Sequence, residues 1–167
     1  MRNYRTNLAL EAKIKNLKEL KKIIARLKAK GKKIVFTNGC FDLLHYGHVK
    51  YLEAAKGKGD ILVVAINSDA SVKKIKGKKR PILKEQERLR IVAALASVDY
   101  VVLFKEITPL KVIQLLKPDI LIKGADWNKA NIVGGDIVLA YGGRVSTARL
   151  VKGRSTTNLI KKIAQAF

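Results

Sequence analysis

The stretch TNGCFDLLHYGH (residues 37–48) decides the fold, because it joins an apolar run to an amphipathic one. Residues 34–36 (IVF) precede it and are typical of the end of a buried strand. Apolar residues at a spacing of three follow it over residues 49–55 and are typical of one face of a helix. The stretch is therefore predicted to be a strand-to-helix turn.

The histidines of this turn suit the binding of a phosphate. The first backbone N–H groups of a helix lack intrahelical partners, and together with the helix dipole they attract anions. His45 and His48 are three residues apart, so both imidazoles can donate to one anion. Gly47 lets the backbone approach that anion, and Gly39 lets the strand exit tightly. A bare H-x-G-H can also be two surface histidines and a turn glycine. The flanking elements and the Gly-Cys-Phe-Asp lead-in favour a site.

The composition indicates one soluble domain. The chain has 167 residues, 48% of them hydrophobic, which is enough for a sizeable core. No apolar run is near the length that spans a bilayer, and the N-terminus lacks the apolar segment of a signal peptide. We therefore expect a cytoplasmic protein with no membrane partner. Cys40 is the only cysteine, which excludes an intrachain disulfide; it is either a reactive thiol or a small, partly buried turn residue.

The chain is strongly basic. Lys and Arg number 35 against 13 Asp and Glu, a formal net charge of +22. A field of this size favours anionic ligands and predicts non-specific attraction of polyanions, including nucleic acid. The basic residues are spread along the chain, without an arginine-rich arm, a zinc finger or the aromatic strands of an RNA-recognition sheet. A non-enzymatic nucleic-acid binder remains the alternative that the charge alone supports.

Expected strands and helices alternate along the chain. Asn16 is expected to cap a helix that ends at Gly31, after a basic extension over residues 1–15. The expected strands cover residues 32–36, 61–66, 98–104, 119–122 and 144–147. The later helices are expected from the turn to about residue 56, over 85–96, from 109 to about 117, between the glycine pairs at 134–135 and 142–143, and after residues 152–157, with Leu159, Ile160 and Ile163 on the packing face. This alternation predicts an α/β fold with a doubly wound parallel sheet of about five strands and an N-terminal helix.

Further polar residues lie near the carboxyl ends of the expected strands, where open parallel sheets bind their ligands. Asn67 and Asp69 follow the second strand. Residues 123–126 follow the fourth, where a lysine, a glycine and a carboxylate suit a phosphorylated polyol or form a plain turn. Residues 73–80 hold six cations and are either a solvated loop or a flexible cover for a polyphosphate leaving group. Arg88, one turn into its helix, is placed to face the ligand.

Three hydroxyl residues, 155–157, open the last helix behind two cations. Ser155 alone is a good helix cap. Three hydroxyls in a row exceed what capping requires, so we also interpret them as a second phosphate cradle. The chain has no G-x-x-x-x-G-K-[ST], G-x-G-x-x-G after a strand, H-E-x-x-H or G-x-S-x-G. Kinase-type phosphate loops, dinucleotide oxidoreductases, zinc proteases and serine hydrolases therefore lose their usual support.

The two phosphate motifs resemble those of the nucleotidyltransferase superfamily of cytidylyl- and adenylyltransferases. Over roughly residues 20–165 the chain is similar to the bacterial D-glycero-β-D-manno-heptose 1-phosphate adenylyltransferases (ADP-heptose synthases). The residues that carry this similarity are 37–42, 67–69, 76–77, 80–81, 98–99, 108–109, 118–119 and 155–158. The resemblance implies a Rossmann-like nucleotidyltransferase domain over residues 32–167, behind an N-terminal extension and helix over residues 1–31.

The resemblance also implies the reaction and the roles of the residues. AMP would pass from ATP to heptose 1-phosphate, giving pyrophosphate and the ADP-heptose that lipopolysaccharide biosynthesis uses. Mg²⁺ would be bound to ATP, with no metal site on the protein. The enzyme is expected to be a homodimer. Glycerol-3-phosphate cytidylyltransferase, which shares both motifs, is the alternative. The implied catalytic residues are His45, His48, Lys76 and Arg80. The implied nucleotide-binding residues are Asn38, Gly39, Cys40, Phe41, Gly47, Lys123, Ser155, Thr156 and Thr157. The implied acceptor-binding residues are Asp42, Asn67, Asp69, Gly124 and Asp126.

Overall fold

Five parallel strands form the centre of the molecule, in the order β3-β2-β1-β4-β5. The computed structural model describes residues 10–124, 131–148, 151, 153 and 155–166. The strands are β1 (Ile34–Gly39), β2 (Ile61–Asn67), β3 (Tyr100–Phe104), β4 (Ile120–Gly124) and β5 (Arg144–Ala148). The predicted fold class and number of strands are confirmed.

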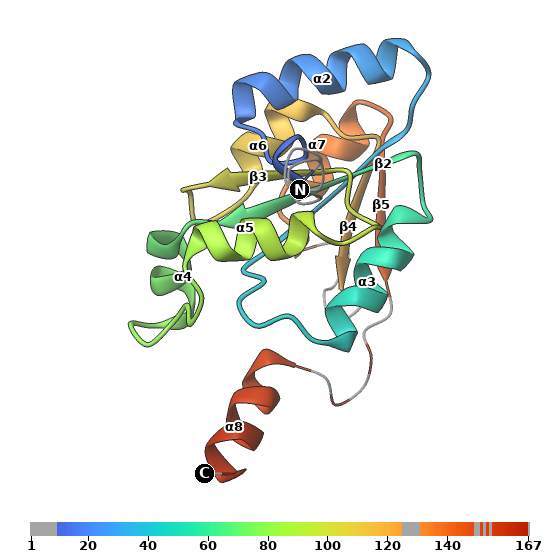
Figure 1. The fold of residues 1–167 in the computed structure, drawn as a ribbon. Helices are drawn as coiled ribbons and strands as arrows, with labels where there is room; N and C mark the ends of the chain where they lie inside the picture. Colours follow the sequence, from blue (N-terminus) through green and yellow to red (C-terminus); the bar gives the residue numbers. More distant parts are fainter. Residues whose placement is uncertain (1–9, 125–130, 149–150, 152, 154, 167) are drawn as a thin grey trace, which may run out of the picture.

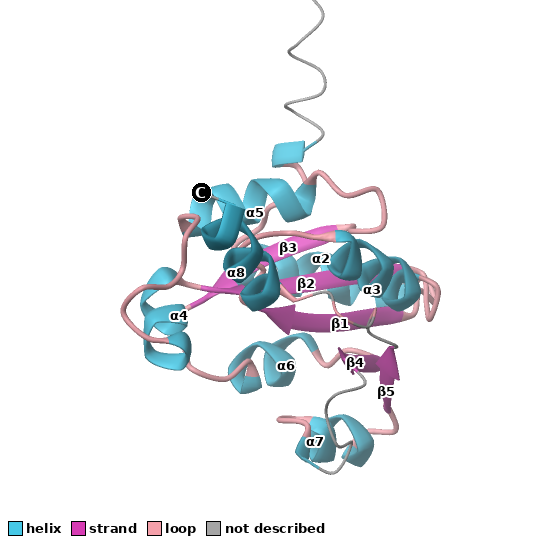
Figure 2. Cartoon of the chain, turned by 90° about the horizontal axis from the view of Figure 1, so that it is seen from below, coloured by secondary structure: helices cyan, strands magenta, loops and turns pink. Residues whose placement is uncertain are grey.

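Helices cover both faces of the sheet (Figures 1 and 2). They are α2 (Leu17–Ala29), α3 (Tyr46–Lys56), α4 (Asp69–Lys76), α5 (Glu85–Ala93), α6 (Leu110–Leu116), α7 (Gly135–Ala140) and α8 (Thr156–Ala166). Helices α3 and α5 pack with one set of strand residues, and α2, α6 and α7 pack with the other set. Since β1, β2 and β4 lie between both layers, their residues form nearly continuous apolar runs.

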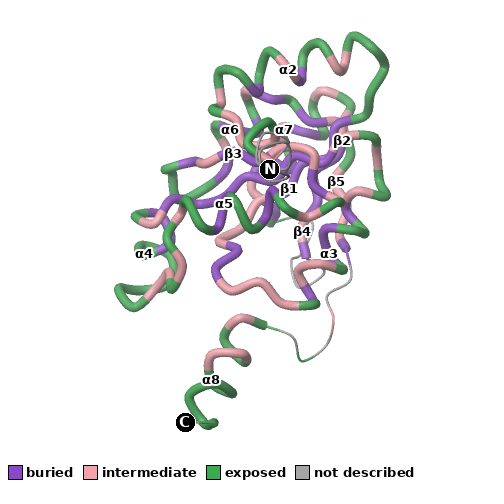
Figure 3. Tube along the Cα trace, viewed as in Figure 1, coloured by how far each residue is buried: buried purple, intermediate pink, exposed green. Residues whose placement is uncertain are grey.

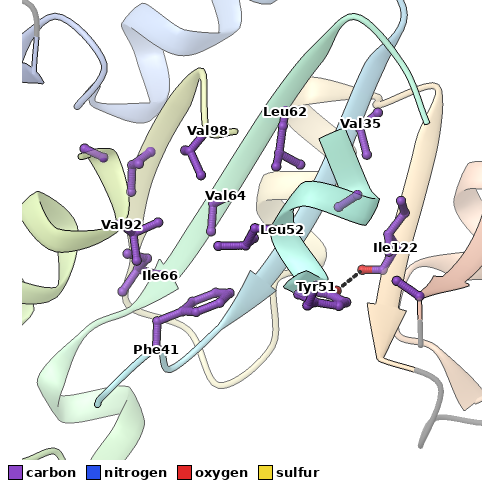
Figure 4. Close-up of a cluster of buried hydrophobic side chains, with 14 of the residues drawn as sticks. Val35, Phe41, Tyr51, Leu52, Leu62, Val64, Ile66, Val92, Val98 and Ile122 are labelled. Atoms are coloured by element: carbon purple, nitrogen blue, oxygen red, sulfur yellow. Dashed lines mark hydrogen bonds between the residues drawn. The ribbon is translucent and has the colours of Figure 1, made fainter. Parts of the chain in front are cut away.

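Alternate residues of β1 and β2 fill the two cores. Val35 and Leu62 contribute to the core under α3 and α5, and Ile34 and Val63 to the core under α2 and α6. The first of these cores, seen in Figure 4, includes Tyr51 of α3, whose hydroxyl donates to the backbone carbonyl of β4 at 3.2 Å. This buried hydroxyl helps to fix the position of α3, the helix that carries the histidine turn.

The N-terminal residues pack more than the sequence predicts. Asn16 caps α2 as expected, since its side chain accepts from the Glu19 N–H at 2.9 Å. Residues 13–15, expected to belong to a patternless extension, form a parallel bridge with β3 in which Ile14 lies opposite Val101. Helix α2 buries Leu20 and Ile24 in the same core as the strands. The predicted homodimer stays a prediction.

Two further expectations are wrong. Residues 73–76, predicted to be loop, form the last turn of α4, which begins after Ser68, whose hydroxyl accepts from the Ser71 N–H at 3.2 Å. The predicted packing face of α8 is covered only in part: Leu159 and Ile160 are partly buried, but Ile163 is 48% exposed, the helix has no fully buried residue, and it lies apart from the sheet (Figures 1 and 3). Among the described residues, no helix combines the length and apolarity needed to cross a bilayer.

Candidate active site

The histidine turn leaves the carboxyl end of β1, the central strand. Phe41 adopts a left-handed backbone conformation with φ 44°. Gly39 leaves room for this turn, because a Cβ there would lie 3.0 Å from the Phe41 ring. His45 occupies the N-cap position of α3, and its carbonyl accepts from the His48 N–H at 2.9 Å. The first turn of α3 therefore begins beside both imidazoles, as the sequence predicts.

The two imidazole rings stack on each other. Their centroids are 3.9 Å apart with an interplanar angle of 25°, and Phe41 packs against His48 with a centroid distance of 5.4 Å. Burial, with a smaller effect of the neighbouring His45, lowers the pKa of His48 to about 4. The His48 Nδ1 and Asn38 Oδ1 atoms are buried and find no hydrogen-bond partner in the described part of the chain. At neutral pH His48 is thus an uncharged imidazole held in a fixed orientation.

This low pKa predicts that His48 destabilises the fold in acid. An unfolded histidine titrates near pH 6.5, so between about pH 6.5 and 4 the unfolded chain takes up a proton that the folded chain refuses, and folded stability is lost. As the pH falls from 7 to 4.5, the free energy of unfolding is expected to decrease in both proteins. The decrease in His48→Gln is expected to be about 1–2 kcal/mol smaller than in the wild type. Urea denaturation at several pH values measures this. The exposed neighbour supplies the control: Tyr46→Gln is expected to keep the wild-type slope, and an unchanged slope in His48→Gln would contradict the assignment.

Asp42 faces the protein. The residue is 2% exposed. Its carboxylate accepts hydrogen bonds from Arg80 Nε at 2.6 Å and from the N–H groups of Ile82 and Leu83 at 2.8 and 2.9 Å. Desolvation alone would raise the pKa of Asp42, but these hydrogen bonds outweigh it and the pKa lies below its usual value. The Asp42 oxygens thus anchor the loop before α5, and the acceptor-binding role of Asp42 stays a prediction.

Arg88 is also buried, which corrects the expectation that it faces the ligand. Its side chain is 0% exposed and donates to the carbonyls of Cys40 and Leu83 and to Asp69 Oδ1. Asp69 is thereby paired with an arginine at 2.7 Å, and the Asn67 amide donates to the Ser71 hydroxyl at 2.9 Å. Both predicted acceptor ligands after β2 are thus engaged within the protein.

The thiol of Cys40 lies partly buried between cations. Burial is the largest influence and raises its pKa, while Lys76, Arg88 and Arg80 partly oppose that effect. A raised pKa keeps the thiol protonated, which favours the turn-residue interpretation over the reactive one.

Lys76, at the end of α4, lies near the histidine turn, because it is one of the cations that act on the Cys40 thiol. Lys76 is exposed and has no acidic partner among the described residues.

The carboxyl end of β4 adjoins the turn as well. Lys123 Nζ donates to the carbonyl of Asn38 at 3.3 Å, which links β4 to β1 where the strand order reverses. Ligands bind at such points in open α/β sheets. Gly124 pairs with Ala148 of β5. Asp126, the fifth predicted acceptor ligand, lies outside the described residues.

The second phosphate motif reaches the histidines. Thr156 donates to the carbonyl of Leu43 at 3.2 Å, and the Ser155 hydroxyl caps α8 by accepting from the Asn158 N–H at 3.0 Å. Thr157 is exposed. A cleft of ≈ 230 Å³ lies between the turn and α8. Its lining residues are His45, Gly153, Ser155, Asn158, Leu159 and Lys162.

Asn158 and Lys162 were missed from the sequence as site residues. Both occupy the face of α8 that Ser155 begins, at spacings of three and four residues, and this spacing was the available signal. The cleft therefore combines an imidazole, a hydroxyl and an ammonium group, which together suit a polyphosphate.

The chain matches the family described as Cytidylyltransferase-like over residues 36–160. It belongs to this family. The match confirms the recognition of a nucleotidyltransferase enzyme that the sequence motifs allow, and it spans the strands, the histidine turn and the start of α8.

Named relatives resemble this cytidylyltransferase-like chain closely. "Bifunctional protein HldE" from Geobacter metallireducens is 59% identical over 157 residues, which are 94% of this chain and 32% of the relative. The chain thus spans about a third of the length of such relatives. A solved structure, the "lipopolysaccharide core biosynthesis protein" from Thermoplasma volcanium, is 34% identical with a TM-score of 0.61, covering 74% of this chain and all of that one. A pantoate-beta-alanine ligase from Francisella tularensis, 17% identical with a TM-score of 0.61 over 91% of this chain and 78% of that one, shares the fold.

Proposed function

We propose that this domain transfers AMP from ATP to D-glycero-β-D-manno-heptose 1-phosphate, releasing pyrophosphate and giving ADP-heptose. The observation that carries the proposal is one cleft that joins His45, at the start of α3, to Ser155, at the start of α8. Two helix starts with donor side chains provide two adjacent phosphate sites, as an α-phosphate and a β,γ-pyrophosphate require. The similarity to heptose 1-phosphate adenylyltransferases, the HldE relatives and the lipopolysaccharide-core protein supports the acceptor.

The reaction needs orientation and charge stabilisation rather than a covalent protein intermediate. An oxygen of the sugar phosphate attacks the α-phosphorus of ATP, and the bond from that phosphorus to the bridging oxygen of pyrophosphate breaks. His45 and His48 donate to the α-phosphate, where negative charge builds up in the transition state. Ser155 and Lys162 bind the β,γ end, and Lys76 approaches the leaving pyrophosphate. Because His48 is uncharged and desolvated, it donates without first having to shed water.

Mg²⁺ is expected with the nucleotide. The described residues contain no group of three His, Cys, Asp or Glu side chains that could hold a metal ion. Asp42 and Asp69 are paired with arginines. The oxygens of the ATP phosphates would hold the ion, which would neutralise part of their charge. The protein's own cations, Lys76 and Lys162, supply the rest.

The acceptor site is proposed at the junction of β1 and β4. Lys123 places an ammonium group beside Asn38, on the same sheet edge as the histidine turn. This charge suits the phosphate of the incoming sugar, and Asn38 Oδ1 offers a buried acceptor for a sugar hydroxyl. A buried acceptor left unpaired penalises substrates that lack the hydroxyl.

A pyrophosphate-release assay of nucleotide and acceptor pairs tests the proposal. We expect ATP with heptose 1-phosphate to exceed CTP with glycerol 3-phosphate by at least about tenfold in kcat/KM. If CTP with glycerol 3-phosphate is the better pair, the acceptor assignment is wrong and the nucleotidyl transfer stands. If no pair releases pyrophosphate while duplex DNA binds tightly in high salt, the nucleic-acid alternative is favoured.

A further inference from the structure

Two ion pairs beside the histidine turn are not used in the proposed chemistry; one of them holds Arg80, whose predicted catalytic role stays a prediction. Asp42 pairs with Arg80 at 2.6 Å, and Asp69 pairs with Arg88 at 2.7 Å. The two carboxylates and two guanidinium groups cancel, so this cluster adds no net charge with which to attract ATP. A buried guanidinium is tolerated only where its donors are satisfied, and breaking such a pair is strongly unfavourable. The cluster therefore has a positional role.

Arg88 joins three segments that meet at the turn. It donates to the carbonyl of Cys40 at 2.6 Å, directly before Phe41 and its left-handed conformation. It donates to Asp69, the first residue of α4, and to the carbonyl of Leu83, in the loop that leads to α5. The planar guanidinium can satisfy several acceptors in fixed directions, which an ammonium group cannot.

Asp42 completes the connection from the other side. Its oxygens accept from the N–H of Leu83, whose carbonyl Arg88 holds, and from Arg80. The two ends of the segment from Asp69 to Leu83 are thus tied to residues 40–42. Lys76 lies on this segment and has no acidic partner among the described residues. The cluster therefore holds both ends of the segment that carries Lys76 at the residues that begin the histidine turn.

We propose that Arg88 is a positioning residue for nucleotidyl transfer: it fixes Lys76 relative to His45 and His48, so that the leaving pyrophosphate and the α-phosphate are stabilised together. This inference rests on the proposed function. Arg88 touches no substrate and acts through Cys40, Asp69 and Leu83. Its loss therefore affects the transition state more than the binding of the acceptor.

The test is a double-mutant cycle between Arg88→Lys and Lys76→Met, read by pyrophosphate release well below the unfolding temperature of each variant. Arg88→Lys is expected to lower kcat about 10- to 100-fold with the acceptor KM changed less than about threefold. In the Lys76→Met background the same change is expected to cost less than about threefold more, because the residue that it positions is already absent. Arg90→Lys is the matched control: Arg90 is on the same helix, its side chain is 56% exposed, and wild-type kcat is expected.

The outcomes distinguish failure of the positioning role from failure of the proposed function. Wild-type kcat in Arg88→Lys, or a loss that multiplies in full with Lys76→Met, overturns the positioning role while the proposed reaction stands. If Arg88→Lys does not fold, Asp69→Asn takes its place in the cycle, since the amide keeps Oδ1 as an acceptor for Arg88 while the charge is lost and Oδ2 becomes an NH₂ donor. Absence of pyrophosphate release from the wild type with every nucleotide and acceptor would instead refute the proposed function.

Discussion

His48→Ala is expected to lower kcat by two to four orders of magnitude, about 3–5 kcal/mol of transition-state stabilisation. His48 lies in the first turn of α3, stacked on His45 and packed by Phe41, with a pKa near 4. Such a ring is oriented before the substrate arrives, so its donation to the developing charge needs no reorganisation. The substitution removes that donor and leaves the backbone N–H groups of α3 in place. KM for ATP is therefore expected to change much less than kcat.

Steady-state kinetics with pyrophosphate detection measure this effect, and the neighbouring residue supplies the control. Tyr46 lies between the two histidines and is 59% exposed, so Tyr46→Phe is expected to keep kcat within about threefold. His45→Ala is expected to fall as His48→Ala does. Near-normal turnover in both histidine variants would remove the turn from the chemistry.

Asp42→Ala is expected to cost about 3–5 kcal/mol of the free energy of unfolding, which is a large share of the stability of a domain of this size. The substitution leaves the Arg80 guanidinium and the N–H groups of Ile82 and Leu83 without their acceptor in a site where Asp42 is 2% exposed. The pKa of Asp42 lies below its usual value, so its contribution is present above the unfolded pKa near 4 and is lost as pH falls through the folded pKa. Urea denaturation at pH 7 and in acid measures both effects.

An exposed carboxylate shows whether the effect is specific. Glu53 forms an ion pair with Lys50 on the surface of α3, with a side chain that is 49% exposed. Glu53→Ala is expected to leave the denaturation midpoint unchanged within error, because exposed pairs contribute little. Equal losses in Glu53→Ala and Asp42→Ala would contradict the anchoring role of Asp42.

The fold could be predicted because its signals are local. Continuous apolar runs mark strands that are covered on both faces, and Asn16 and the histidine turn mark helix starts within a few residues of the chain. The α4 helix was missed because its local signals are weak. It buries only Ser71 and Val72, so its lysines mask the helical period, and the Ser68 cap was the one local signal available.

The roles of charged residues could not be predicted in this way. Asp42 and Arg88 lie within or near the motifs, which suggested ligand contact. Asp42 instead pairs with Arg80, 38 residues away in the chain, and Arg88 donates to the carbonyl of Cys40, 48 residues away. A short motif shows which residue types are close to a site but not which of them pair with each other. Which charged residues pair with each other depends on which of them are buried, and their burial depends on how α4 and α5 pack around the turn.

Strand β3 is one edge of the sheet, and the bridge at Ile14 bears on how the protein avoids aggregation. An open strand edge is a template for pairing with the sheet of another molecule. Residues 13–15 occupy the Val101 N–H and carbonyl, and Lys13 and Lys15 flank the bridge with positive charge. At Val101, a second molecule that approached this edge would meet backbone groups that are already paired, with lysines on either side. The segment before α2 thus removes part of the template that the edge of β3 would otherwise offer to another strand.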